Sequence, residues 1–297
     1  PGRVSAAEWS DLDGDGDPDL VLAREWDSPQ IWINRDGKLE AADRVFEGTP
    51  LNGLWSAMTV SDLNGDGRPD IVLGNLGLNA PYRASAEEPI RLWHTTDPAG
   101  EGKLIETTVA DGEEWPREEL LRLEKSFPRE TRRIQRFARY AEMTFEDVFP
   151  AVKDSADYAV KEINELRTGV LWQRKNGAFR FEPLPSFAQS GRALSILAED
   201  VNGDGKPDLV FSFEYNSPEA WAERVEEGHL GLFLNRGERS FETILPRQSG
   251  LDLKGTPRGL ASGDLDGDGR PELVVVLSEG LPVVFSRTRA THRGGGR

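Results

Sequence analysis

Four copies of one acidic segment, spread along the chain, constrain its fold more than any other feature of the sequence. The copies begin at Asp11, Asp62, Asp200 and Asp264 and read DLDGDGDPDLVL, DLNGDGRPDIVL, DVNGDGKPDLVF and DLDGDGRPELVV. Each copy follows a short run of apolar or small residues and continues into a run rich in β-branched residues. A recurring unit of this kind predicts a repeat fold in which each unit is a strand, an acidic loop and a second strand.

Oxygen-bearing side chains recur at positions 1, 3, 5 and 9 of every loop. They are Asp11, Asp13, Asp15 and Asp19; Asp62, Asn64, Asp66 and Asp70; Asp200, Asn202, Asp204 and Asp208; and Asp264, Asp266, Asp268 and Glu272. Position 7 is Asp17, Arg68, Lys206 or Arg270, and this tolerance for basic residues indicates that position 7 contributes its backbone carbonyl. Glycine at positions 4 and 6 allows the tight backbone that such a loop needs to wrap around one centre.

Carboxylates packed this closely repel one another unless a cation neutralises them. Ca²⁺ prefers a flexible shell of about six to eight hard oxygen ligands, whereas Mg²⁺ prefers a stricter octahedron and retains more water. Zinc and copper are poor candidates because the chain has no Cys and only three His. The sequence therefore predicts about four Ca²⁺ sites, each formed by positions 1, 3, 5, 7 and 9 of one loop. An Asp- and Gly-rich solvated turn is the alternative, and fourfold repetition of one spacing argues against it.

Position 12 separates these loops from EF-hands, which need Glu at that position followed by a helix. Here position 12 is Leu22, Leu73, Phe211 or Val275, an apolar residue within a strand-like run. The same residues, with the absence of Cys, argue against thrombospondin-type calcium repeats. The wide separation of the loops argues against glycine-rich nonapeptide rolls, which stack in tandem. The remaining class of calcium motif is a loop that joins the two strands of a hairpin.

At these residues the sequence resembles the FG-GAP/VCBS repeat superfamily, whose calcium loops occur in the integrin α-subunit β-propeller. A likeness over nearly the whole chain is to bacterial relatives of cartilage acidic protein, the ASPIC/UnbV-type FG-GAP proteins. It rests on the ordered segments WSDLDGDGDPDLVLAREW, GNLGLNAPYRASAEEPIRLW and LPSFAQSGRALSILAEDVNGDGKPDLVF. The resemblance implies an all-β fold, a β-propeller of FG-GAP/VCBS blades with a short α-helical insertion. It also implies a secreted, periplasmic or outer-surface protein with calcium in its blade loops and no established catalytic residues.

The resemblance and the repeats together predict that residues 1–297 form a single β-propeller. About five blade-like units can be counted, whereas propellers close with about four to eight blades, so the propeller is either small or incomplete at its N-terminal side. One of these units passes through residues 90–109. Its loop has Ala99 at the third position, which predicts a degenerate site, and metal binding near Asp97 is left open.

Residues 114–157 break the β pattern and have helical spacing. Pro128 suits a first helical turn, and TFED at 144–147 resembles a capping box. We therefore expect two or three short helices inserted within a blade.

The charge and composition of the chain limit the classes of partner and of chemistry that it can have. A net charge of −16 predicts repulsion from nucleic acid and anionic membranes, so nucleic acid is not expected as a partner. No apolar run approaches the ~20 residues that span a bilayer, so direct membrane insertion is not expected. The absence of Cys excludes disulfides and a Cys nucleophile. The chain begins without Met and without the pattern of a signal peptide, so we expect a processed form or a piece of a longer protein.

The sequence offers little for catalysis. His94, His229 and His292 have no Ser or Cys partner at a recognisable motif spacing, so we expect a protein that is not an enzyme. The leading hypothesis is a non-enzymatic, calcium-binding extracytoplasmic scaffold that binds a protein or glycan ligand. Two alternatives stay open. One is a subunit of a larger extracytoplasmic complex, and the other is a calcium-dependent polysaccharide lyase or hydrolase on a propeller fold.

Overall fold

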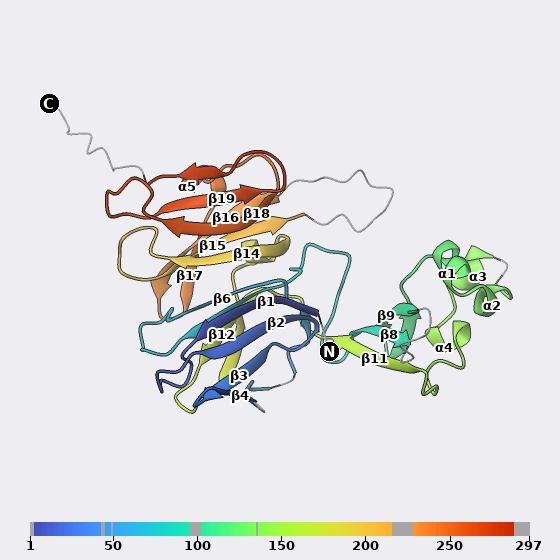
Figure 1. The fold of residues 1–297 in the computed structure, drawn as a ribbon. Coiled ribbons are helices and arrows are strands. Elements are labelled where there is room, and N and C mark those ends of the chain that lie inside the picture. Colours follow the sequence, from blue (N-terminus) through green and yellow to red (C-terminus); the bar gives the residue numbers. More distant parts are fainter. Residues whose placement is uncertain are drawn as a thin grey trace.

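The computed structural model describes residues 3–42, 45–48, 50–95, 102–134, 136–215 and 228–287. Within these residues the strands form five antiparallel sheets. Four of them, which we call the first to fourth blades, lie side by side in chain order, and the fifth projects from the row together with the four helices between residues 120 and 148 (Figure 1). The predicted all-β fold of propeller-type blades with short helices is confirmed.

The first blade is continuous in sequence, whereas the second is not. The first blade contains β1 (Arg3–Ser10), β2 (Asp19–Asp27), β3 (Gln30–Arg35) and β4 (Lys38–Ala41), with β5 (Gly53–Leu54) paired to β2. The second blade contains β6 (Ala57–Ser61), β7 (Asp70–Gly74), β12 (Gly169–Gln173) and β13 (Phe179–Pro183) in the order β13-β12-β7-β6. The chain therefore leaves the second blade after β7 and returns to complete it at β12.

The third and fourth blades follow in sequence after the 3₁₀ helix η1 (Ser186–Gln189). The third blade contains β14 (Arg192–Glu199), β15 (Asp208–Glu214), β16 (Gly228–Gly237) and β17 (Ser240–Ile244). The short helix α5 (Pro246–Ser249) leads to the fourth blade, which contains β18 (Pro257–Gly263), β19 (Glu272–Leu277) and β20 (Val283–Phe285). The first strands of neighbouring blades, β1 with β6, β6 with β14 and β14 with β18, contact one another.

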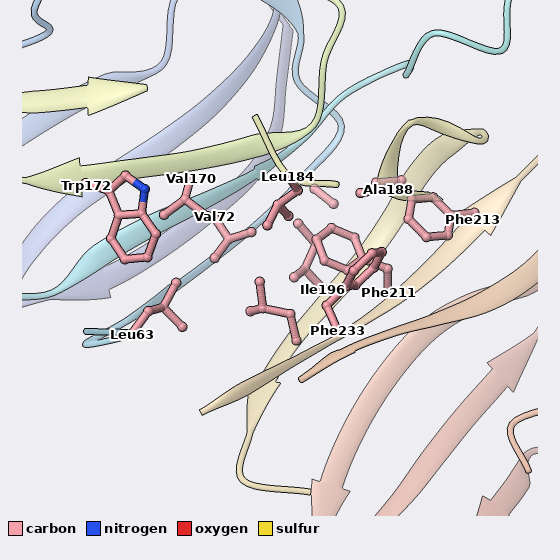
Figure 2. Close-up of a cluster of buried hydrophobic side chains, with 13 residues drawn as sticks. Leu63, Val72, Val170, Trp172, Leu184, Ala188, Ile196, Phe211, Phe213 and Phe233 are labelled. Carbon is pink, nitrogen blue, oxygen red and sulfur yellow. The ribbon is translucent and has the colours of Figure 1, made fainter. Parts of the chain in front are cut away.

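Apolar side chains pack between neighbouring blades. Figure 2 shows the cluster between the second and third blades, in which Val72 and Trp172 of the second blade share one core with Phe211 and Phe233 of the third. The Phe211 and Phe233 rings meet edge to face, with centroids 5.4 Å apart. Because both faces of these blades are covered, every residue of β7 and β12 is buried, which explains their continuous apolar runs.

The outward faces of the first and fourth blades are not covered by another blade. In the first blade, Val21 and Ala23 of β2 are buried toward the second blade. Trp9 of β1 lies on the opposite face of the same sheet and is 57% exposed. In the fourth blade Val275 is buried, and Val276 and Val284 on the opposite face are 48% and 49% exposed. The first and last sheets thus carry the apolar pattern of a blade interior on a surface that faces solvent.

The insertion between β7 and β12 contains a sheet as well as helices. Its strands are β8 (Ile90–Thr95), β9 (Leu104–Ala110), β10 (Glu113–Pro116) and β11 (Tyr158–Ile163) in the order β10-β9-β8-β11. Its helices are α1 (Leu120–Ser126), α2 (Pro128–Thr131), α3 (Phe137–Tyr140) and α4 (Phe145–Val148). The unit expected over residues 90–109 therefore belongs to this inserted sheet. The loop near Asp97 lies outside the described residues.

The inserted sheet and helices share a core of their own. Trp93 of β8 stacks on Phe145 of α4, with ring centroids 5.1 Å apart. At the start of α4, the Thr144 hydroxyl accepts a hydrogen bond from the Asp147 N–H at 3.2 Å, and the Asp147 carboxylate accepts one from the Thr144 N–H at 2.9 Å. This is the capping box that the sequence suggested. Among the described residues, no helix combines the length and apolarity that crossing a bilayer requires.

Candidate metal-binding loops

The four acidic loops occupy equivalent places in the four blades. Each joins the first and second strands of its blade, namely β1 to β2, β6 to β7, β14 to β15 and β18 to β19. The glycines at positions 4 and 6 of every loop have φ between 73° and 94°. Side chains rarely adopt this conformation, so the two glycines are what allows the loop to close on itself.

The carboxylate at position 1 organises the loop backbone. In the first loop, Asp11 accepts hydrogen bonds from the N–H groups of Gly14 and Gly16 at 2.7 and 2.9 Å. Asp62, Asp200 and Asp264 accept the equivalent pair in their own loops. For Asp200, burial opposes ionisation, but the backbone hydrogen bonds outweigh it and hold the pKa below its usual value. Position 1 is therefore a carboxylate fixed at the centre of each turn.

The carboxylate at position 5 accepts the N–H of position 7. The four bonds, made by Asp15, Asp66, Asp204 and Asp268, are 2.9, 3.1, 3.0 and 3.0 Å long. Where position 7 is Arg68, its guanidinium also pairs with Asp66. The contribution of position 7 through its carbonyl stays a prediction.

The carboxylate at position 9 is buried in every loop, with Asp19, Asp70 and Asp208 fully buried and Glu272 5% exposed. Asp70 accepts the N–H of Leu63 at 3.2 Å and the N–H of Gln173 at 2.9 Å, and so joins the start of the loop to the third strand of the sheet. Burial, reinforced by the nearby charges of Asp66 and Asp62, raises the pKa of Asp70 to about 7 against these hydrogen bonds. Burial likewise raises the pKa of Asp208.

Position 3 divides the loops into two kinds. Where it is Asp, in the first and fourth loops, three carboxylates offer oxygens within 4.8 Å of one another and can hold a metal ion; these triads are Asp11, Asp13 and Asp15, and Asp264, Asp266 and Glu272. Slight desolvation and the charges of Asp15 and Asp19 raise the pKa of Asp13, although its side chain is exposed, and a cation at this point would reverse that effect.

In the second and third loops position 3 is Asn, and its amide turns toward position 9. Asn64 donates to the Asp70 carboxylate at 3.3 Å, and Asn202 donates to the Asp208 carboxylate at 3.1 Å. The Oδ1 atom of Asn64 is buried without a hydrogen-bond partner among the described residues. An oxygen in that state suits a hard cation, so the donor set of the second loop also fits calcium.

All predicted ligand residues therefore lie in equivalent loops, and the structure brings six of them together as two triads. The sequence reasoning missed the amides of the third strands. Gln173 donates to the carbonyl of Leu12 in the first loop at 2.7 Å, and Asn235 donates to the carbonyl of Leu63 in the second loop at 2.7 Å. Each amide thus ties its blade to the loop of the preceding blade. An amide followed by Arg before a hairpin turn recurs in INRDGK, WQRKNGA and LNRGERS, and this signal could have found them.

One histidine has a hydroxyl partner that the sequence did not suggest. Ser190 Oγ lies 2.8 Å from His229 Nε2, and the rings of Phe213 and Tyr215 stack on the imidazole at 5.0 and 4.8 Å. Burial lowers the pKa of His229 to about 4. Its Nδ1 atom has no hydrogen-bond partner among the described residues, so none of their carboxylates orients the ring as in a catalytic triad. We interpret the pair as part of the packing of the third blade.

Comparison with known protein families matches residues 11–73 and 157–211 to the FG-GAP-like repeat. The two segments contain the first three loops and cover less than half of the chain. A search of curated proteins found no match.

Proposed function

We propose, from the premise that this chain is built on FG-GAP-like repeats, that it is a non-enzymatic, calcium-stabilised scaffold that presents its surface to protein or glycan ligands outside the cytoplasm. One observation carries the proposal. The same acidic loop stands at the same place in four blades, and two copies already gather three carboxylates within 4.8 Å. Free calcium outside cells is high enough to load loops of modest affinity, of the order of 10⁻⁴–10⁻³ M.

Calcium would act in these loops as a structural tie. Positions 1 and 5 supply carboxylate oxygens from the turn, position 3 supplies a carboxylate or an Asn amide oxygen, and position 9 supplies a carboxylate oxygen from the buried start of the second strand. A divalent ion at this point offsets the desolvation and the repulsion that raise the pKa of Asp13, and the burial that raises the pKa of Asp70. Calcium is favoured over magnesium because its coordination shell accepts an irregular set of oxygen donors, whereas magnesium requires a near-ideal octahedron.

Thermal unfolding with and without calcium tests the proposal. We expect EDTA to lower the unfolding temperature and excess calcium to restore it, because an ion that binds only the folded state stabilises it. At a calcium concentration about 100 times the dissociation constant, the gain is about 2.7 kcal/mol per site. Magnesium at the same concentration serves as the control and should restore less. An unfolding curve that ignores both EDTA and calcium would contradict the structural role of the metal.

A second candidate, a subunit of a larger extracytoplasmic complex, is supported by the outward faces of the first and fourth blades. Trp9 and Val276 lie on sheet faces whose opposite sides are packed as blade interiors. Exposed apolar faces of this kind are typical of surfaces that a further subunit covers. The native mass of the protein, compared with 32.9 kDa for one chain, tests this candidate.

A further inference from the structure

A groove lies where the loops and hairpin turns of the first two blades meet. It consists of two adjoining pockets of about 620 and 500 Å³ that share Arg68, Gln173, Arg174, Lys175 and Asn176. Ile31, Ile33 and Phe179 add apolar lining to the larger pocket, and Arg239 of the third blade lines the smaller one. We call the two pockets together the interblade groove. Their volumes fall in the range of small-ligand sites.

The interblade groove is basic although the chain is acidic. Its described charged lining consists of five basic residues, Arg35, Arg68, Arg174, Lys175 and Arg239, and three acidic ones, Asp11, Asp13 and Glu47. The formal net charge of the chain, by contrast, is −16. Two of the three acidic residues belong to the first loop, where a bound cation would neutralise them. A local excess of positive charge on such a chain indicates an anionic ligand.

The arginines of the groove are held in place but keep capacity for a ligand. Arg174 approaches Glu47 at 3.8 Å, and Arg239 approaches Glu182 at 3.8 Å. Contacts of this length between partly exposed groups contribute little and leave guanidinium N–H groups to donate elsewhere. Arg239 also lies over the Trp172 ring, 5.2 Å from its centroid, which limits its movement.

Two polar atoms in the groove lining are buried without a hydrogen-bond partner among the described residues. They are Nε of Arg68, a donor, and Oε1 of Gln173, an acceptor. The Gln173 side chain is fixed, because the residue is 4% exposed and its Nε2 donates to the Leu12 carbonyl. Because both atoms are buried, a ligand in the groove meets the exposed parts of the arginine side chains instead, which are 32% exposed for Arg68 and 30% for Arg174.

We propose that the interblade groove binds an acidic carbohydrate, a glycan that contains uronic acid. Its carboxylate accepts from the guanidinium groups of Arg68 and Arg174, the geometry for which Arg is best suited. The exposed amide of Asn176, which lines both pockets, bonds to sugar hydroxyls, and the partly exposed Ile33 receives the C–H face of a pyranose ring. An acidic peptide fits less well, because extended peptides usually pair with a free strand edge, whereas this wall is the hairpin turn at residues 174–177.

Calorimetric titration with a hyaluronan hexasaccharide, which contains glucuronate, tests the assignment in buffer with about 1 mM calcium. We expect saturable binding that weakens as salt is added, because the contacts are ionic and partly exposed. Replacing both basic turn residues, R174E with K175E, should weaken binding at least about tenfold. The matched control is R236E, since Arg236 follows Asn235 in the third blade as Arg174 follows Gln173 in the second. It should keep the affinity of the parent chain.

Two further ligands make the outcome decisive. The methyl ester of the hexasaccharide keeps the hydroxyls but loses the charge, and it should bind at least about tenfold more weakly. Hexaglutamate keeps the charge without sugar hydroxyls, and binding as tight as that of hyaluronan would overturn the assignment in favour of a peptide site. Because this inference deepens the proposed scaffold function, the same samples are melted with calcium. No hexasaccharide binding by a chain that calcium stabilises would overturn the ligand assignment alone.

Discussion

Asp70 lies fully buried where the second loop enters its strand. Its carboxylate accepts hydrogen bonds from the backbone N–H groups of Leu63 and Gln173. The sequence marked this residue as one of the five metal ligands of its loop. The structure gives the residues at position 9 a second role, because three of them accept an N–H from the third strand of their sheet. This role depends on which strand lies beside the second, and no spacing within the loop contains that information.

Replacing Asp70 by Asn should change how stability depends on pH when calcium is absent. The folded-state pKa is about 7, above the unfolded value of 3.8, so the folded state binds the proton more tightly. Stability from this group is therefore complete below about pH 4 and declines as pH rises toward 7, by up to about 4 kcal/mol. D70N should remove that decline. Urea unfolding in EDTA between about pH 4 and 8 measures it, with D268N, at position 5 of the fourth loop, as the control.

The same titration with excess calcium should show a different dependence of stability on pH for the parent chain and for D70N. Calcium favours the ionised carboxylate, so the parent chain should then be more stable than D70N at neutral pH. Equal pH slopes for the two chains in EDTA would contradict the raised pKa.

Position 3 shows what sequence can and cannot tell about a single site. Asp13 and Asp266 were expected to act like Asn64 and Asn202, since all four carry oxygens. In the structure the carboxylates join triads, while the amides donate to the buried residue at position 9. The loops were found because their information is local. The difference between loops with Asp and loops with Asn at position 3 was not predicted, because it depends on the direction in which that side chain turns.

At the scale of strands and helices, the sequence predicted the pair of strands around each loop and the helical region after Glu114. It could also place the cap at Thr144, because a capping box is a short-range motif. It did not predict that β12 and β13 complete a blade begun by β6 and β7, nor that the helices are accompanied by a sheet. Both facts depend on pairing between segments far apart in the chain.

The amide of each third strand leads to a prediction about how blades hold together. Asn34 and Asn235 each donate to a proline carbonyl of their own blade and accept from a glycine N–H in the following turn. Asn235 alone of the two also donates to Leu63 of the preceding blade, at 2.7 Å. N235L should therefore cost about 1–3 kcal/mol more than N34L, because it leaves the Leu63 carbonyl buried and unpaired.

Urea unfolding of the two variants measures the difference directly, since their contacts within a blade are alike. Equal losses in N34L and N235L would mean that the contact between blades contributes nothing measurable to stability.

At the scale of the whole molecule, the row of blades carries two kinds of surface that composition alone does not distinguish. The interblade groove is basic within an acidic chain, and the outward faces of the first and fourth blades are apolar. The groove is a product of folding, because its residues come from segments that are far apart in sequence. A total charge of −16 predicted repulsion from nucleic acid and anionic membranes, yet it contained no information about where positive charge gathers.

If a further subunit covers the outward face of the first blade, the surface substitution W9E should change the assembly and not the fold. Trp9 is 57% exposed, so its replacement removes little that the single chain buries. Light scattering after size exclusion should give a mass above 32.9 kDa for the parent chain and a lower mass for W9E. L121E serves as a control, because Leu121 is also exposed, at 55%, but lies on the inserted helices. Identical masses for all three chains would count against a covered face.

The interruption of the second blade also has a consequence for the order of events during synthesis. Strand β7 ends at Gly74 and must wait until Gly169 has been made before it can pair with β12. Closing so long a segment costs entropy that an unstructured chain would have to lose at that moment. The inserted unit removes most of that cost, since Ile90 at its entry pairs with Ile163 at its exit. Once the inserted unit has folded on the ribosome, its two ends lie close together, so the two halves of the second blade are near neighbours when β12 is made.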